Sequence, residues 1–225
     1  MSVITISREY GSQAEKIAQQ VAERLGYSYF DKEILADVAR AARTTEDKIS
    51  LYDEKDEHGL RSFLKKLFVP EYPFPYYYSP DLPMEWSMYP IERGASIEKE
   101  PILKADEVVS FFRHVVEKLW KRGNVVIVGR SSQRILAAKP DTLHVRFIGA
   151  IEDRCKNVMQ QEGITHSDAL EKIQKIDKQR LQYLKHYYNM DGADETLYHL
   201  VLNTSLMRIE QAVKVIIAAV CHHEA

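Results

Sequence analysis

The sequence predicts an α/β protein in which helices cover both faces of a parallel sheet. Short apolar runs rich in Val, Ile and Leu alternate along the chain with longer segments whose apolar residues recur at helical spacing. The short runs are almost continuously apolar, which is typical of strands buried on both faces. Parallel strands need crossover connections, so the alternation favours a three-layer α/β/α arrangement.

The stretch from Val3 to Leu25 is the first unit of this pattern. The β-branched run Val3–Ile6 predicts a buried strand, and a turn over 7–12 with one glycine, Gly11, follows it. Apolar residues at helical spacing come next, at Ile17, Ala18, Val21, Ala22 and Leu25. A strand, a tight turn and a helix in this order are typical of a phosphate-binding loop, because the first helical amides have no partner within the helix.

The rest of the chain continues the alternation. Gly26 ends the first helix, and 27–30 is a short extended piece. Further strands are predicted at 124–128, 143–148 and 199–202, and helices at 32–43, 60–69, 102–122, 131–138, 151–161, 167–189 and 208–220. Right-handed crossovers place the carboxyl ends of all the strands at one edge of the sheet, where ligands bind in such folds.

The composition limits the range of functions. The 225 residues fit a single domain over 1–225, and a net charge of −2 argues against nucleic acid as the main partner. The two cysteines lie far apart and have no metal-ligand spacing. No apolar run is long enough to cross a bilayer, and no signal peptide is recognisable. We therefore expect a cytoplasmic protein without a membrane partner.

The segment 52–100 differs from the rest of the chain. It begins with charges and continues into the Pro/Tyr-rich run PEYPFPYYYSPDLPMEWSMYP, whose prolines exclude a regular helix or a central strand. We interpret it as an insertion in the domain. Its aromatic residues are expected either to pack on one another, to form a contact between subunits of a homo-oligomer, or to stack on a nucleobase, and the last of these is the least favoured.

Polar residues follow two strands at the same predicted edge. Gly11 and Ser12 come after the first strand, Gly129 and Arg130 follow 124–128, and Asp31 lies close by. An arginine held just beyond a buried strand suits a phosphate group, and a structural ion pair is the alternative. Another candidate pair lies at i,i+3 on the helix 167–189, Asp177 and Arg180, for which spacing alone favours a solvated surface ion pair.

The loop after the first strand lacks the full motif GxxxxGK[ST]. Gly11 is the only glycine in place, Ala14 stands at the lysine position and Lys16 at the hydroxyl position. Two interpretations therefore remain open. The loop either binds phosphate or is an ordinary strand-to-helix turn with solvated Arg8 and Lys16.

The order of several segments resembles the cytidylate-kinase-like family of bacterial P-loop proteins. The segments are ITISREYGS, YFDKEIL, VVIVGR, VRFIGAIEDR, IDKQR and YHLVLNT. The resemblance covers nearly the whole chain apart from the aromatic insertion. It implies the fold of P-loop NTP hydrolases and nucleoside-monophosphate kinases, with an inserted acceptor-binding region and a lid over 163–192. The implied reaction transfers the γ-phosphoryl group of ATP, with Mg²⁺, to CMP or dCMP.

The resemblance also implies a role for each matched residue. The donor phosphates would be held by Gly11, Ser12, Gln13, Ala14, Glu15 and Lys16, and Ser12 is the candidate contact to Mg²⁺. The acceptor would be bound by Asp31, Arg130 and Asp177. The catalytic cations would be Arg8, Lys16, Arg130 and Arg180, with Arg180 on the transferring group. The donor adenine would lie beside Asn203 and Thr204.

The chain departs from the family pattern in its loop. Relatives usually read SREYGSGGREIA, whereas this chain reads SREYGSQAEKIA. Glu15 thus brings a negative charge beside the expected phosphates, Ser131 stands where cytidylate kinases have an acid, and Ile173 stands where they have a lid arginine. These departures motivate a second hypothesis, a non-catalytic nucleotide-binding or scaffold protein. A third is a kinase of a non-nucleotide small molecule, selected by 52–100.

Overall fold

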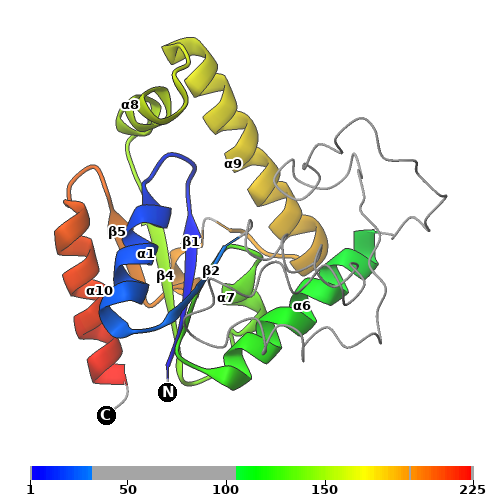
Figure 1. Cartoon of the computed structure of the whole chain (residues 1–225). Coiled ribbons are helices and arrows are strands. Elements are labelled where there is room, and N and C mark those ends of the chain that lie inside the picture. The colour runs from blue at the N-terminus through cyan, green and yellow to red at the C-terminus, as the bar shows by residue number, and fades with distance from the viewer. Residues whose placement is uncertain (1, 32–104, 193, 224–225) are drawn as a thin grey trace, which may run out of the picture.

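The computed structural model describes residues 2–31, 105–192 and 194–223, and in these ranges five parallel strands form one sheet (Figure 1). The strand order is β2-β3-β1-β4-β5. The strands are β1 (Val3–Arg8), β2 (Ser28–Phe30), β3 (Val125–Val128), β4 (Thr142–Ile148) and β5 (Leu200–Asn203). The predicted parallel sheet is confirmed, and the short extended piece after Gly26 is its edge strand β2.

Helices cover both faces of the sheet, and a pair of helices stands above its carboxyl edge (Figure 1). One face is covered by α1 (Ala14–Leu25) and α10 (Ile209–His223), and the other by α6 (Ala105–Arg122) and α7 (Ser132–Ile135). Above the edge lie α8 (Ile151–Glu162) and α9 (His166–Tyr188), and the 3₁₀ turn η2 (Glu195–Leu197) leads into β5. This is the predicted α/β/α architecture.

The strand β3 has apolar side chains on both faces, which explains its continuous apolar run. In β3, Val126 and Val128 belong to the core beneath α1 and α10, whereas Val125 and Ile127 belong to the core beneath α6. Leu119 of α6 is fully buried against the second core. Because alternate residues of a strand point to opposite faces, both faces must be apolar when helices cover both.

The strand register brings two loops together. Ile6 of β1 pairs with Val128, the last residue of β3, and β1 continues to Arg8, which lies against Gly129. Residues 9–13 and 129–131 therefore leave the sheet side by side, at the edge where ligands bind in parallel α/β folds.

The helix α7 is shorter than its predicted range of 131–138. Past Ile135 the backbone hydrogen bonds change to the tighter i→i−3 pattern. The Ala137 N–H donates to the Arg134 carbonyl, and the Lys139 N–H donates to the Leu136 carbonyl. Pro140 disfavours helical backbone at Lys139, so this tightened segment cannot continue as a helix past Ala138.

Several predicted features lie outside the described residues. They are the helices at 32–43 and 60–69 and the insertion 52–100. Within the described residues, none of the helices combines the length and the apolarity that a bilayer span needs.

The hairpin of α8 and α9 has a small core of its own. Cys155 and Val158 of α8 pack against Ala169 and Ile173 of α9, and all four are buried. Ile173 therefore faces its partner helix, and an arginine at this position would have to be accommodated in an apolar interface. Of this hairpin only α9 lies within the range 163–192, whose assignment as a lid stays a prediction.

Candidate functional site

The loop after β1 turns tightly beneath α8. Gly11 has a left-handed φ of +81°, and a Cβ there would lie 2.8 Å from the Arg154 carbonyl oxygen. Gln13, which caps α1, also has a positive φ of 60° and offers no side-chain cap to the helix. A non-glycine residue in this conformation carries local strain, of a kind often found at functional sites.

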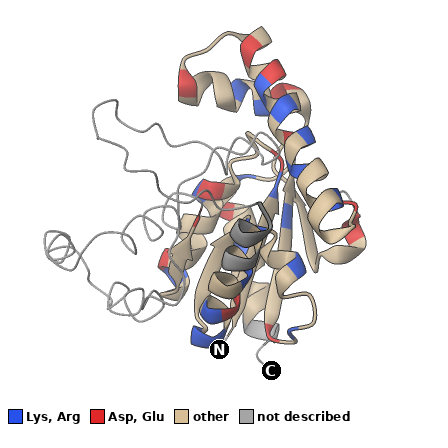
Figure 2. Ribbon diagram, turned by 90° about the vertical axis from the view of Figure 1, so that its right-hand side faces the viewer, with Lys and Arg blue, Asp and Glu red and all other residues tan. Residues whose placement is uncertain are grey.

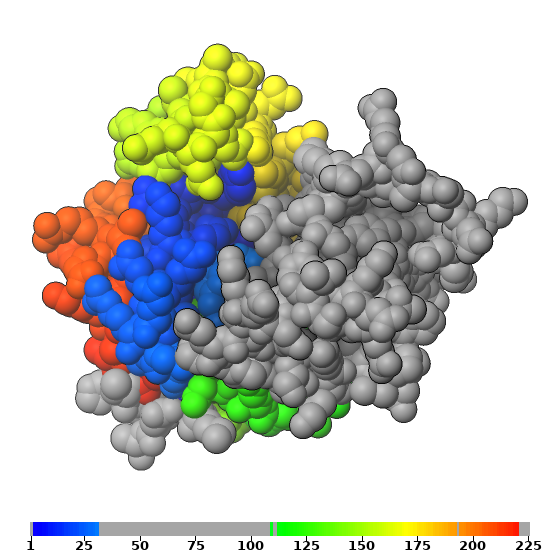
Figure 3. All heavy atoms as spheres, viewed as in Figure 1, coloured from blue at the N-terminus to red at the C-terminus, as the bar shows by residue number. Residues whose placement is uncertain are grey.

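Side chains of α8 and α9 hold this loop in place. Asp177 Oδ1 accepts the Tyr10 N–H at 2.8 Å, and the Arg154 guanidinium bridges Asp177 Oδ2 at 2.5 Å and the Tyr10 carbonyl at 3.2 Å. The Asn157 side-chain amide donates to the Gly11 carbonyl at 2.9 Å. Figure 3 shows the hairpin directly above the N-terminal segment that carries the loop. The helical pair is thus hydrogen-bonded directly to the loop.

The first turn of α1 contains a carboxylate paired with an arginine. Arg8 Nε lies 2.7 Å from Glu15 Oε1, and the Arg8 side chain is only 7% exposed. Burial acts to raise the pKa of Glu15, but the charges of Arg8 and Arg180 and the hydrogen bond from Arg8 outweigh it and lower that pKa to about 2. An internal anion therefore sits at the start of α1, where the amides before Ile17 have no carbonyl partner within the helix.

The lowered pKa of Glu15 predicts a pH dependence of stability. Since its pKa is lower in the folded state than the ordinary 4.5, ionised Glu15 stabilises the fold above that pH, and the contribution is lost as the pH falls toward about 2. We expect urea unfolding to show wild type more stable than Glu15→Gln near neutral pH, with the difference shrinking as the solution is acidified. A constant difference between neutral and acidic solution would contradict this.

Gly129, at the end of β3, makes room for Arg8. Gly129 has a φ of +79°, and a Cβ there would lie 2.5 Å from Arg8 Nη1.

We expect Gly129→Ala to move the Arg8 guanidinium away from Glu15 and to lower the free energy of unfolding by about 1–3 kcal/mol, from backbone strain and the weakened ion pair. Chemical denaturation measures this. Gly163→Ala is the matched control, because Gly163 has a similar φ of +69° but no atom within 4 Å of an added Cβ. Equal losses of unfolding free energy in Gly129→Ala and Gly163→Ala would show that the contact with Arg8 does not contribute to the effect.

Arg130 follows Gly129 in a strained turn. Arg130 and Ser131 have φ values of 57° and 53°, so three successive residues are left-handed. The Arg130 guanidinium lies over the Phe112 ring of α6, 4.3 Å from its centre, and its charge acts on the Tyr183 hydroxyl of α9. Arg130 is buried, and rigid placement of this kind suits the recognition of an anion.

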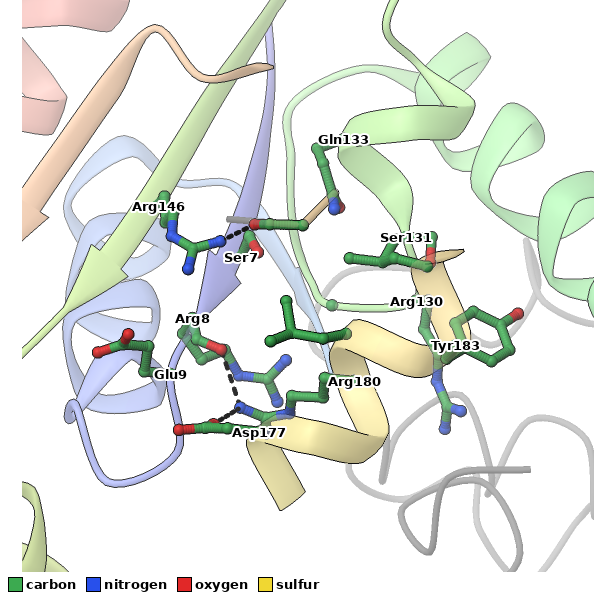
Figure 4. A pocket seen from close by; sticks show the side chains of 14 residues that line it. Ser7, Arg8, Glu9, Arg130, Ser131, Gln133, Arg146, Asp177, Arg180 and Tyr183 are labelled. Carbon is green, nitrogen blue, oxygen red and sulfur yellow. Dashed lines mark hydrogen bonds and ion pairs between the residues drawn. The ribbon is translucent and has the colours of Figure 1, made fainter. Parts of the chain in front are cut away.

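A cavity of about 110 Å³ opens at this edge of the sheet (Figure 4). Its wall includes side chains from β1, β4 and α9 and from the turn after β3, among them Arg8, Arg130, Arg146 and Arg180. Arg180 Nη1 donates to the Arg8 carbonyl at 2.9 Å, and Arg146 donates to the Gly192 carbonyl. Two carboxylates, Glu9 and Asp177, also line the cavity, and the four arginines leave an excess of positive charge that suits an anionic ligand.

The remaining predicted residues occupy separate places around this centre. Asp31 lies beside the Tyr29 hydroxyl, whose pKa is raised by burial and by the charge of Asp31 and, more weakly, of Glu15. Asp31 is therefore close to the Arg8–Glu15 pair. Ser12 is fully buried and its hydroxyl donates to the Glu9 carbonyl at 2.8 Å, whereas Lys16 is exposed on α1.

The two residues predicted beside the adenine lie at the end of β5. The Thr204 hydroxyl donates to the Ile148 carbonyl at 3.1 Å, and the Asn203 side chain accepts the Ser205 N–H at 3.0 Å. Both residues are half-buried next to the junction of β4 and α8. Their strand, β5, is separated from β1 by β4. Their contact with adenine stays a prediction.

Sequence reasoning missed two residues that build the site. Arg154 joins the loop to Asp177, and Arg146 lines the cavity from β4. Both lie in the segment VRFIGAIEDR, with Arg146 inside an apolar strand and Arg154 in the first turn of a helix, but neither was assigned a role. Figure 2 shows further Lys and Arg residues in succession along α9, which adds positive charge above the edge. The described residues contain no group of three His, Cys, Asp or Glu side chains arranged to hold a metal ion.

The parallel sheet, the tight loop into α1 and the arginine-lined cavity beside it define an α/β protein suited to bind an anion at the carboxyl edge of its sheet. The sequence model of the cytidylate kinase-like family matches residues 3–206, and the chain belongs to this family. The resemblance and fold class expected from the sequence are thus confirmed, and a phosphotransferase is the class of enzyme that family and fold support.

Individual relatives agree with this assignment. The chain is 30% identical over 119 residues to a cytidylate kinase of Ignicoccus hospitalis, covering 52% of this chain and 67% of that one. It is 30% identical over 108 residues to a cytidylate kinase of Methanopyrus kandleri, covering 44% of this chain and 56% of that one. The structure of an uncharacterized protein from Eubacterium ventriosum matches over 98% of each chain, with a TM-score of 0.63 and 23% identity. This last likeness supports the fold alone.

Proposed function

We propose that the protein transfers the γ-phosphoryl group of ATP to a nucleoside monophosphate, with CMP or dCMP as the preferred acceptor. The observation that carries this proposal is the meeting of four arginines at one cavity, immediately beside the first turn of α1. Phosphoryl transfer needs positioning and charge neutralisation more than a covalent nucleophile, and this arrangement offers both. The preference for cytidine nucleotides rests on the family and on the relatives in Ignicoccus hospitalis and Methanopyrus kandleri.

In this proposal the donor and the acceptor meet over the end of β1. The donor phosphates lie against the amides at the start of α1, where the helix dipole favours an anion. The acceptor phosphate enters the cavity and contacts Arg130 and Arg146. Arg180 lies between the two, because its guanidinium is bonded to the Arg8 carbonyl and reaches the cavity. Arg180 is then the group that stabilises charge on the transferring phosphoryl.

Mg²⁺ accompanies ATP in such reactions and neutralises charge on the phosphate oxygens. The described residues supply no ready cage for the ion, and the Ser12 hydroxyl already donates to a backbone carbonyl. A role for Ser12 at the metal stays a proposal, as does the contact of Asp31 with the acceptor.

A specific observation favours a second candidate, a nucleotide-binding protein without turnover. Glu15 occupies the first turn of α1 and neutralises Arg8, while Asp177 is engaged by Arg154 and the Tyr10 amide. Arg8 and Asp177, which both have proposed roles in the transfer, are thus paired with other residues of the protein. A third candidate, a kinase of a non-nucleotide acceptor, keeps the same donor site and differs only in the acceptor.

A coupled assay for ADP separates the three candidates. Pure protein with MgATP is offered CMP, dCMP, UMP, AMP and GMP, and separately a set of phosphate-free sugars and sugar acids. We expect ADP formation to be fastest with CMP or dCMP. Protein that is folded, binds ATP and yields no ADP with any acceptor would favour the second candidate. Turnover only with the non-nucleotides would favour the third.

A further inference from the structure

We propose that Glu15 is a built-in competitor of the donor phosphates and sets how tightly the protein binds a nucleotide triphosphate. Its carboxylate fills the anion position at the start of α1, so a triphosphate binds there only after Glu15 leaves Arg8. This inference rests on the proposed function, which places the donor phosphates at the same turn. It identifies Glu15 as a residue that determines affinity, which is a role separate from that of the arginines around the cavity.

The position of Arg8 is fixed by its surroundings. Its side chain is almost fully buried, and one terminal nitrogen lies against the Cα of Gly129, where a Cβ would come within 2.5 Å. From that place its Nε is directed at Glu15 at 2.7 Å. Arg8 therefore faces the first turn of α1, where it forms an ion pair with Glu15. A phosphate that used Arg8 in this orientation would need the space of the Glu15 carboxylate.

Several groups stabilise the ionised carboxylate of Glu15. Besides Arg8, the charge of Arg180 and the backbone N–H of Glu15 itself favour its ionised form, and its charge reaches the Tyr29 hydroxyl of β2. These are groups that would equally stabilise a phosphate oxygen. The carboxylate thus reproduces part of the environment expected of a bound phosphate.

Glu15 is nevertheless free to be displaced. Its side chain is 45% exposed, in contrast to that of Arg8, so rotation about its flexible side-chain bonds carries the carboxylate into water without unpacking the core. The neighbouring Lys16 is exposed on the same turn and is able to meet the displaced carboxylate or the incoming anion. The cost of binding is the separation of Arg8 from Glu15 and the repulsion between Glu15 and the phosphates.

Calorimetric titration with ATP and with inorganic tripolyphosphate tests the proposal. The variant Glu15→Gln keeps the shape of the side chain and removes its charge, and we expect it to bind both probes at least about tenfold more tightly than wild type at low salt. Glu15→Asp keeps the charge but shortens the side chain, and is expected to stay within about threefold of wild type. The matched control is Glu23→Gln, the same charge change at an exposed position in the last turn of α1, which should leave affinity unchanged.

The outcomes separate this inference from the proposed function. Equal or weaker binding by folded Glu15→Gln, or an equal gain in Glu23→Gln, overturns the role of Glu15. If wild type forms ADP from ATP in that case, the proposed function stands without it. Tighter binding by Glu15→Gln alone supports the inference even when neither protein forms ADP, a result that would leave a nucleotide-binding protein without turnover.

Discussion

Replacing Arg180 by alanine is expected to lower the turnover of ATP and CMP by a factor of about 10³–10⁵, the range observed for arginines that stabilise charge on a transferring phosphoryl group. The reason is its position, with the guanidinium bonded to the end of β1 and lining the cavity. Steady-state measurement of kcat and KM checks this, and the loss should fall mainly on kcat, since the proposed contact strengthens in the transition state.

Two further variants make the result on Arg180 specific. Arg180→Lys keeps the charge and loses the planar fork, so it should recover only part of the lost rate. Lys178→Ala removes a cation from an exposed position of the same helix and should change kcat little. If Arg180→Ala is folded and its kcat stays within about threefold of wild type, Arg180 does not stabilise the transferring group.

The second large effect is expected on stability, from Asp177→Ala. This change leaves the Arg154 guanidinium, whose side chain is 10% exposed, without its nearest carboxylate, and it removes the acceptor of the Tyr10 N–H. We expect the free energy of unfolding to fall by about 3 kcal/mol, at the lower end of the cost of breaking a buried pair, because a Glu9 oxygen lies 3.5 Å from Arg154. Urea denaturation measures this loss.

The control for Asp177 is another ion pair of the hairpin. Asp153 and Lys156 of α8 pair at 3.1 Å with both side chains well exposed, so Asp153→Ala should change the unfolding free energy little. Asp177→Asn retains an oxygen for the Tyr10 N–H and should lose less than the alanine variant. Equal stability of Asp177→Ala and wild type would show that the hairpin does not depend on Asp177 for its contact with the loop.

The fold was accessible from the sequence because its signals are local and periodic. The two-faced burial of β3 appears as four consecutive apolar residues, and the face of α1 that packs on the sheet appears at helical spacing. The end of α7 was less predictable, because the tightening past Ile135 depends on backbone bonds in the turn before Pro140.

The site was less accessible, because it depends on contacts between distant segments. Spacing paired Asp177 with Arg180, yet their closest contact is 3.9 Å, while Asp177 bonds the loop through Tyr10 and pairs with Arg154 at 2.5 Å. The charge of Glu15 was visible in the sequence, but its pairing with Arg8 depends on the space that Gly129 leaves at the end of β3. No local pattern reports such an arrangement.

Phosphorus NMR of one reaction mixture tests the central claim most directly. Pure protein is incubated with MgATP and CMP, and the spectrum is followed over time. The predicted result is loss of the ATP and CMP signals in step with the appearance of the terminal phosphates of ADP and CDP, in equal amounts. Release of inorganic phosphate without CDP, or an unchanged spectrum from protein shown to bind both nucleotides, would contradict transfer between them.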